Sequence, residues 1–452
     1  MSRTTTVRIL YVVHQFLPRY FTGTEQHTWA IASEAKRRGH EVEVFTLEPD
    51  FSERSPLIET THDVIDGVPI TRLRFWMHLD RSFERMEYRH PFVAERFRRL
   101  LVERRPDLVH VAHLRYLGVG LLDECKSLGI PTLVYLHDFW FLCPAVTLRR
   151  NDGALCDGPP EGGLGCVACV RPDAAQELER NGLREAIARA RGAMPPSSTP
   201  SRTAQGRART LIERPGLLRD ALLRADCIVS PSRFLAATFV ANGFPAGRIE
   251  VLGFGLDPAH LAGVVHTPRA AGAPLRVGYI GSIAEYKGTD LAVDAVAGAR
   301  EPMKLMVFGR IEEHDPWAKA LAARARASPN VSFAGPFARS DLGAVLGGLD
   351  VVVVPSRWYE NAPFVVLEAQ AAGVPVLASG HGGLSERIRH EQDGELFAPG
   401  DVADLCARLE RLAREPARLA RYRANQPRIP TLAEHGAELV AIYASLAEGR
   451  GS

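Results

Sequence analysis

Two glutamates, Glu360 and Glu368, flank the point where a run of four valines gives way to an apolar helical stretch. The valine run, 351–354, is typical of a strand buried on both faces, and Pro363 fits the first turn of the helix that follows. Open α/β sheets bind ligands where such a strand ends, and free helix N–H groups favour anions, especially phosphates. We interpret Glu360 as facing a reacting group and Glu368 as binding ligand hydroxyls. The alternative for Glu368 is a solvated edge of the helix.

Two further side chains, those of Lys287 and His137, also lie at the ends of predicted strands. Lys287 lies in the loop after a predicted strand, 275–281, and just before a predicted helix. A lysine beside helix N–H groups could hold a diphosphate, although a solvated loop lysine is the simple alternative. His137 ends another predicted strand, 131–137, and so lies on the ligand side of its sheet. A loop histidine is more often structural, but this position favours a site.

Four of the seven cysteines gather in one Gly/Pro-rich segment: Cys143, Cys156, Cys166 and Cys169. Four thiols in so short a stretch could close a tetrahedral zinc site. Only the last pair has the C-x-x-C spacing, so reduced thiols and disulfides remain the alternatives. Disulfides are the least favoured of these in a cytosolic chain.

Composition excludes several classes of protein. The chain has 452 residues, of which 46% are hydrophobic and 24% charged, as in ordinary globular proteins. A net charge of +2 gives no reason to expect nucleic acid as a partner. No apolar run approaches the length of a membrane span, and the first apolar run is too short for a signal peptide. We expect a cytoplasmic protein. The arginine-rich segment 81–105, with its interleaved phenylalanines, fits a peripheral contact with the inner membrane face. A core-packed helix with a solvated basic face is the alternative.

The order of predicted elements indicates an α/β protein with two doubly wound domains. Strand, loop, helix and strand follow one another from residue 8, and again from residue 275. We predict a first domain at 1–256, carrying a cysteine- and arginine-rich insertion at about 143–220. A linker at 257–273 leads to a second domain at 274–428. A terminal helix occupies 429–452.

The segment 351–376 resembles the signature of the retaining glycosyltransferases of family 4, which have the GT-B fold. That family carries two glutamates at this spacing and a following G-x-P-V strand, matched here by Glu360, Glu368 and 373–376. The phrase from His137 to Pro144 and the cysteines after it resemble a subset of that family. Two departures stand out, because the family has two adjacent glycines where this chain has Gly23-Thr24, and an arginine where it has Ser282.

The resemblance implies transfer of a sugar from a nucleotide sugar to the hydroxyl of a sugar or lipid-linked sugar, with retained configuration. It implies that no metal is needed for catalysis, that the second domain binds the nucleotide, and that the terminal helix packs on the first domain. A nucleotide-sugar epimerase and a non-catalytic sugar-nucleotide-binding subunit are the alternatives. The residues implied at the reacting centre are His137, Glu360 and Lys287. Those implied to bind the donor are Gly23, Gly281, Ser282, Lys287, Asn361, Ala362, Pro363, Phe364, Glu368, Gly382 and Gly383.

Overall fold

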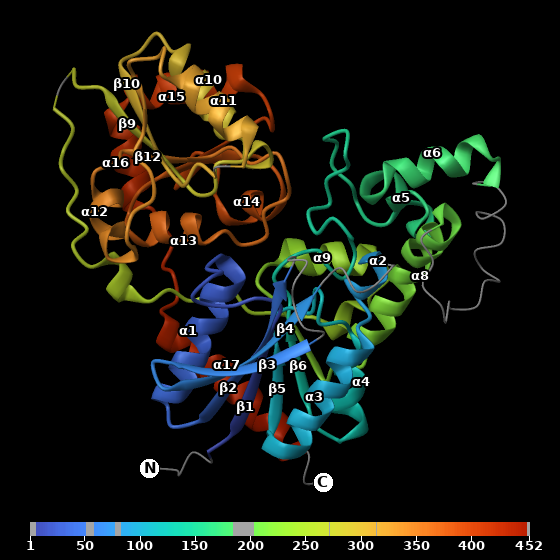
Figure 1. The fold of residues 1–452 in the computed structure, drawn as a ribbon. Helices are drawn as coiled ribbons and strands as arrows, with labels where there is room; N and C mark the ends of the chain where they lie inside the picture. Colours follow the sequence, from blue (N-terminus) through green and yellow to red (C-terminus); the bar gives the residue numbers. More distant parts are fainter. Residues whose placement is uncertain are drawn as a thin grey trace. The chain divides into compact units, whose positions relative to one another are not determined.

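The computed structural model describes residues 6–50, 58–76, 83–183, 203–270, 272–312 and 314–449. The chain divides into two compact units, each built on its own sheet (Figure 1). Unit 1 comprises residues 1–252 and 436–452, and unit 2 comprises residues 253–435. The predicted linker at 257–273 is therefore part of unit 2, where Leu261 and Val264 pack against a cluster of buried apolar residues.

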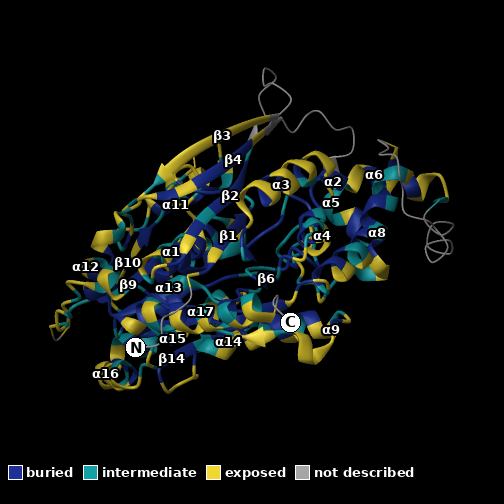
Figure 2. Cartoon of the chain, turned by 90° about the horizontal axis from the view of Figure 1, so that it is seen from below, coloured by how far each residue is buried: buried dark blue, intermediate teal, exposed yellow. Residues whose placement is uncertain are grey.

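Unit 1 is built on an eight-stranded sheet in the order β3-β4-β2-β1-β5-β6-β7-β8. All neighbouring strands are parallel except the edge pair β3 and β4, a hairpin that turns at Asp66-Gly67, a dipeptide typical of such turns. The central strands are buried on both faces, whereas β3 is exposed (Figure 2). The strands are β1 (Arg8–Val13), β2 (Glu41–Asp50), β3 (Ile58–Ile65), β4 (Val68–Trp76), β5 (Leu108–Val111), β6 (Thr132–Tyr135), β7 (Cys227–Ser230) and β8 (Glu250–Val251).

The helices of unit 1 lie between these strands in sequence, except α17 (Leu432–Glu448), which follows the strands of unit 2. The others are α1 (Gly23–Arg37), α2 (Phe83–Met86), α3 (Pro91–Arg104), α4 (Gly120–Ser127), α5 (Cys166–Val170), α6 (Pro172–Arg180), α8 (Ala204–Leu222) and α9 (Arg233–Ala241). Helix α17 belongs to unit 1 from Gly436 onwards. The described part of the insertion consists of a largely irregular loop followed by α5, α6 and α8, which share a small apolar core. The predicted flexible break at 194–201 lies outside the described residues.

Unit 2 has a six-stranded, wholly parallel sheet in the order β11-β10-β9-β12-β13-β14. The strands are β9 (Leu275–Ile280), β10 (Met303–Phe308), β11 (Val331–Phe333), β12 (Val351–Val354), β13 (Val376–Ser379) and β14 (Gly394–Phe397). The helices are α10 (Thr289–Ala297), α11 (Pro316–Ala325), α12 (Leu342–Gly347), α13 (Phe364–Ala371), α14 (Gly382–Arg387), α15 (Val402–Arg414) and α16 (Pro416–Ala424). The prediction of two doubly wound α/β sheets is confirmed.

Candidate active site

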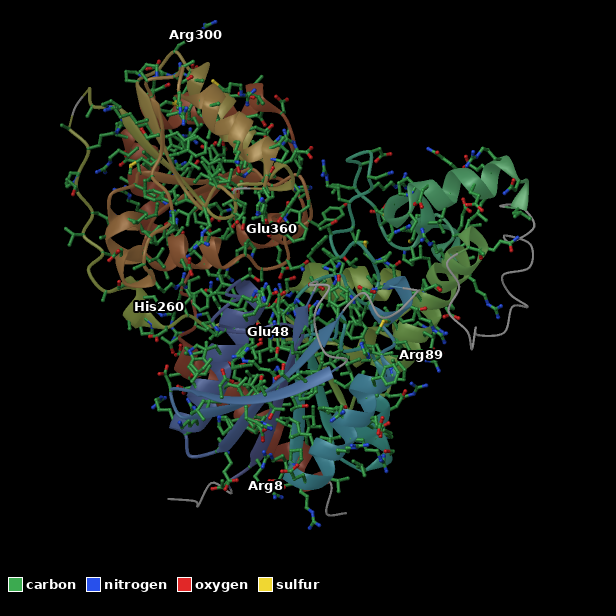
Figure 3. The ribbon with its side chains drawn as sticks, in the orientation of Figure 1. Arg8, Glu48, Arg89, His260, Arg300 and Glu360 are labelled. Carbon is green, nitrogen blue, oxygen red and sulfur yellow. The ribbon has the colours of Figure 1, made fainter. Side chains whose placement is uncertain are left out.

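Lys287 and Glu360 meet at the switch point of the unit 2 sheet. The strand order reverses between β9 and β12, and ligands bind in the crevice outside the carboxyl ends of such strands. Lys287 follows β9, and Glu360 lies in the loop that joins β12 to α13 (Figure 3). The ammonium Nζ of Lys287 lies 2.8 Å from Oε1 of Glu360. Two of the three residues that the family resemblance places at the reacting centre are thus in direct contact.

A glycine makes this contact possible. Gly288 has a φ of +70°, and a Cβ at this position would lie 1.9 Å from the carbonyl oxygen of Pro355, at the end of β12. Only glycine allows the loop after β9 to approach the loop after β12 so closely. The same approach brings the side chain of Lys287 over the ring of Trp358, with Nζ 4.7 Å from the ring centroid.

Glu360 is a buried carboxylate that stays ionised. Its oxygen Oε1 accepts hydrogen bonds from Lys287 (2.8 Å), from the Ser356 hydroxyl (2.7 Å) and from Trp358 Nε1 (2.8 Å). Burial alone would raise the pKa of Glu360, but Lys287 and these hydrogen bonds hold it below the ordinary value. Because all three bonds end on Oε1, the other oxygen takes no part in this network and is suited to a ligand hydroxyl.

Glu368 has a different partner. It is buried in α13, with 3% of its surface exposed, so the alternative of a solvated helix edge is wrong. Its carboxylate forms an ion pair with Arg339, a residue of the short helical turn 339–341. A ligand hydroxyl that binds Glu368 would therefore share the carboxylate with a cation. Pro363 immediately precedes α13 and does not lie in its first turn.

The other predicted donor-binding residues of unit 2 lie at the carboxyl ends of its strands, either in the loops after them or at the first residues of α13 and α14. Gly383 packs directly on the loop of Glu360, because a Cβ there would lie 1.8 Å from the carbonyl oxygen of Asn361. The Gly383 N–H also donates to the carbonyl of Glu360 at 2.7 Å. Ser282 follows β9, and its carbonyl accepts a hydrogen bond from the Tyr279 hydroxyl at 2.6 Å. The remaining members of this set are Gly281, Ala362, Phe364 and Gly382.

Two predicted residues belong to unit 1. Gly23 is exposed and is the first residue of α1. His137 follows β6 and is half-buried, with its ring centroid 5.1 Å from that of His27 and 5.4 Å from that of Tyr135. Both residues therefore lie at the carboxyl edge of the unit 1 sheet, as predicted from their positions after a strand and at a helix start.

The four clustered cysteines line one small cavity of about 20 Å³ in the insertion. All four are free thiols. Burial first, and the neighbouring thiols second, raise the pKa of Cys166 to about 12. Within the described residues, no three metal-ligating side chains already stand in an arrangement that would hold an ion.

The apolar side of the arginine-rich helix α3 packs into the core of unit 1. Phe97 and Leu100 are buried in unit 1, so they cannot enter a membrane as the sequence suggested. Arg98 pairs with Glu124, Arg99 with Glu95, and Arg104 with Glu43. Phe92 and Val102 remain exposed on the outer side. Among the described helices, none combines the length and apolar character needed to span a bilayer.

Sequence reasoning missed Ser356 and Trp358, which fix Glu360, and Arg339, which pairs with Glu368. Ser356, Trp358 and Glu360 alternate in one short loop, and this spacing was a signal that could have pointed to a shared site. Arg339 is 29 residues from Glu368, and no local pattern connects them.

Comparisons with known proteins cover most of the chain. The family model described as glycosyl transferase 4-like domain matches residues 22–255, and the model of glycosyl transferases group 1 matches residues 268–428. Glycogen synthase of Mycobacterium tuberculosis is 33% identical over 173 residues, which are 38% of this chain and 41% of that protein. The chain therefore matches less than half the length of that relative.

Solved structures resemble the chain along nearly its whole length. Sucrose-phosphate synthase from Thermosynechococcus elongatus has a TM-score of 0.61 at 17% identity, covering 98% of this chain and 97% of that one. HepE from Anabaena, in complex with UDP and glucose, has a TM-score of 0.58 at 16% identity, covering 98% and 99%. These likenesses establish the GT-B fold.

Proposed function

Because the chain belongs to the glycosyl transferase 4-like family, we propose that it transfers a sugar from a nucleotide-sugar donor to an acceptor hydroxyl and retains the anomeric configuration. The observation that carries this proposal is the contact between Lys287 and Glu360 at the switch point of unit 2. A lysine beside the N-terminus of α10 suits a departing diphosphate, and an ionised glutamate suits a sugar hydroxyl.

The reaction has two electrostatic demands. A departing diphosphate accumulates negative charge, which Lys287 and the helix N–H groups stabilise without a metal ion. The sugar develops positive, oxocarbenium-like character, and Glu360 orients it through its hydroxyls. We also propose a role in the reaction for His137, at the carboxyl edge of the unit 1 sheet. We further propose that the product belongs to a surface polysaccharide or glycoconjugate and that the acceptor is a sugar or a lipid-linked sugar.

Product analysis tests this function. Purified protein is incubated with UDP-glucose, ADP-glucose and other nucleotide sugars, with and without a panel of octyl glycosides, in the presence of EDTA. UDP and ADP sugars come first because HepE and a starch synthase of the same fold bind UDP and ADP. We expect a new glycosidic bond with the anomeric configuration of the donor. Interconversion of the nucleotide sugar without an acceptor would indicate an epimerase, and binding without turnover would indicate a non-catalytic subunit.

Replacing Glu368 with glutamine should weaken nucleotide binding by about 1–3 kcal/mol, the range for loss of a hydrogen bond to a charged group. We propose that Glu368 binds the ribose while Arg339 holds its carboxylate in place. Calorimetry with UDP measures the effect, and Arg339→Gln is the control. The control should lower stability while keeping more of the affinity, because it retains the carboxylate. Unchanged affinity in Glu368→Gln would discard the ribose contact.

We propose that the four cysteines of the insertion hold a structural zinc ion. Their common cavity has a volume of about 20 Å³, which is enough for one water-sized atom or ion. Thiolate is a preferred zinc ligand, and the metal would displace the thiol protons. We expect about one zinc per chain in freshly purified, reduced protein, measured by mass spectrometry of the metal, and less than half as much in Cys166→Ser. Metal-free protein would leave reduced thiols as the correct interpretation.

We also propose a peripheral contact between the outer side of α3 and anionic membranes. Phe92 and Val102 are exposed there, close in sequence to the exposed Arg96 and Arg105. Such a mix binds anionic headgroups, and the attraction is screened within about 10 Å at 0.1 M salt. The triple variant Phe92→Ser/Arg96→Gln/Arg105→Gln should cosediment less with phosphatidylglycerol vesicles at low salt than the wild type does. Equal binding to anionic and neutral vesicles would exclude this contact.

A further inference from the structure

The sheet of unit 1 has a switch point of its own. Strand β1 has β2 on one side and β5 on the other, so the strand order reverses between β1 and β5. The crevice outside the carboxyl ends of two such strands is the preferred ligand position of an open α/β sheet. His14 follows β1 directly, and His113 follows β5 after one residue. Their rings pack together with centroids 4.1 Å apart.

His113 is fixed in one tautomer. Its Nδ1 accepts a hydrogen bond from the Arg115 backbone N–H at 3.1 Å, so this nitrogen carries no proton. Its Nε2 therefore donates to Oδ2 of Asp138, at 3.0 Å. Asp138 is itself held by the Trp140 N–H, which donates to Oδ1 at 2.8 Å. Because each ring nitrogen has a partner, the His113 ring offers His14 a rigid surface.

His14 lacks such partners. It is half-buried, and its Nδ1 is screened from solvent without a hydrogen bond to any described residue. Buried polar atoms in folded proteins nearly always have a partner, so this nitrogen has an unused capacity for one hydrogen bond. Burial, the largest cause, holds the pKa of His14 well below its ordinary value, and the positive charge of Arg115 acts in the same direction. A neutral imidazole has one donor and one acceptor nitrogen, which match a hydroxyl group.

We propose that His14 binds a sugar hydroxyl at the switch point of unit 1, and that His113 and Asp138 are positioning residues that hold its ring. The inference rests on the proposed function and names a contact of that reaction. The hydroxyl comes either from the acceptor or from the sugar being transferred. A neutral ring has no charge to attract a phosphate, and no group of described side chains at this place could hold a metal ion.

The test separates ring packing from hydrogen bonding. His14→Phe keeps a planar ring against His113 but removes both nitrogens, whereas His14→Asn keeps a polar group near the place of Nδ1. The matched control is His62→Phe, an exposed histidine of β3 in the same unit. Each variant is assayed for hydrolysis of UDP-glucose and for transfer to octyl glycosides. Calorimetry compares UDP with UDP-glucose, and thermal unfolding checks the fold.

We expect His14→Phe to fold normally and to lose about tenfold in one sugar-dependent quantity, the factor for roughly one hydrogen bond, while its affinity for UDP stays unchanged. A raised KM for the octyl glycoside with normal hydrolysis assigns the hydroxyl to the acceptor. A weaker affinity for UDP-glucose relative to UDP assigns it to the donor sugar. The loss in His14→Asn, whether in KM or in affinity, should be smaller than the loss in His14→Phe. His14→Asn also serves as the test if His14→Phe does not fold.

Wild-type values in both His14 variants would overturn the inference and leave His14 a packing residue. A wild-type protein that binds UDP-glucose but never turns it over would overturn the proposed function instead. In that case the calorimetric comparison still decides whether His14 contacts sugar.

Discussion

Replacing Lys287 with alanine should lower turnover by about 10²–10³-fold, the loss seen when a group that stabilises developing negative charge is removed from an active site. Lys287 lies at the N-terminus of α10, with its ammonium 2.8 Å from Glu360. The variant removes the cation proposed to stabilise the departing diphosphate and also frees Glu360 from its charged partner. Steady-state hydrolysis of the donor identified by the nucleotide-sugar panel measures the effect.

The matched control is Lys319→Ala, which removes an exposed lysine from α11 of the same unit. It should keep wild-type turnover. The unfolding temperature of Lys287→Ala should fall far less than its turnover does, because Lys287 itself is a quarter exposed and Ser356 and Trp358 still bind the buried Glu360. A drop in turnover that merely follows a loss of folded protein would contradict a role in the reaction.

Replacing Arg214 with methionine should destabilise unit 1 by about 3–5 kcal/mol, the range for removing one partner of a buried ion pair. Arg214 lies in α8 with only 1% of its side chain exposed. Its Nε donates to Glu87 at 3.2 Å and its Nη2 donates to the Trp140 carbonyl at 2.6 Å. The variant leaves a carboxylate buried without this cation. The free energy of unfolding in urea, followed by tryptophan fluorescence, measures the loss.

Two further variants interpret that result. Arg219→Met removes an exposed arginine from the same helix and should change stability by less than about 1 kcal/mol. Arg214→Met combined with Glu87→Gln should be more stable than Arg214→Met alone, because the unpaired charge is removed as well. A loss in Arg214→Met no larger than in Arg219→Met would show that this ion pair does not anchor α8.

Local signals were sufficient to predict the main elements. The valine run of β12 and the Asp-Gly sequence between β3 and β4 each indicate their structure within a few residues. The positions of Glu360 and Lys287 at one edge of a sheet were predictable because each lies in a loop between a strand and a helix. Their contact was not predictable, since it depends on the closeness of β9 and β12 in a sheet whose order the sequence does not state.

Side-chain partners from distant segments were beyond sequence reasoning. The pairing of Glu368 with Arg339 and of Arg214 with Glu87 depends on tertiary packing across 29 and 127 residues. The packing of α3 was not predictable for a related reason. Its spacing fits a membrane-facing helix and a core-packed helix equally well. The structure shows that Phe97 and Leu100 pack inside unit 1, and a membrane contact of the outer side stays a prediction.

The last helix gives unit 1 an unusual order of assembly. Tyr443 in α17 is fully buried in unit 1, where its hydroxyl lies 2.7 Å from Nδ1 of His110 in β5. During synthesis on the ribosome, β5 emerges more than 300 residues before Tyr443, and the whole of unit 2 is made in between. Until α17 has been synthesised, the sheet of unit 1 therefore has an apolar face that α17 does not yet cover. Unit 2 can complete its own parallel sheet before that. A nascent chain stalled before α17 is the species in which this protein most needs a chaperone.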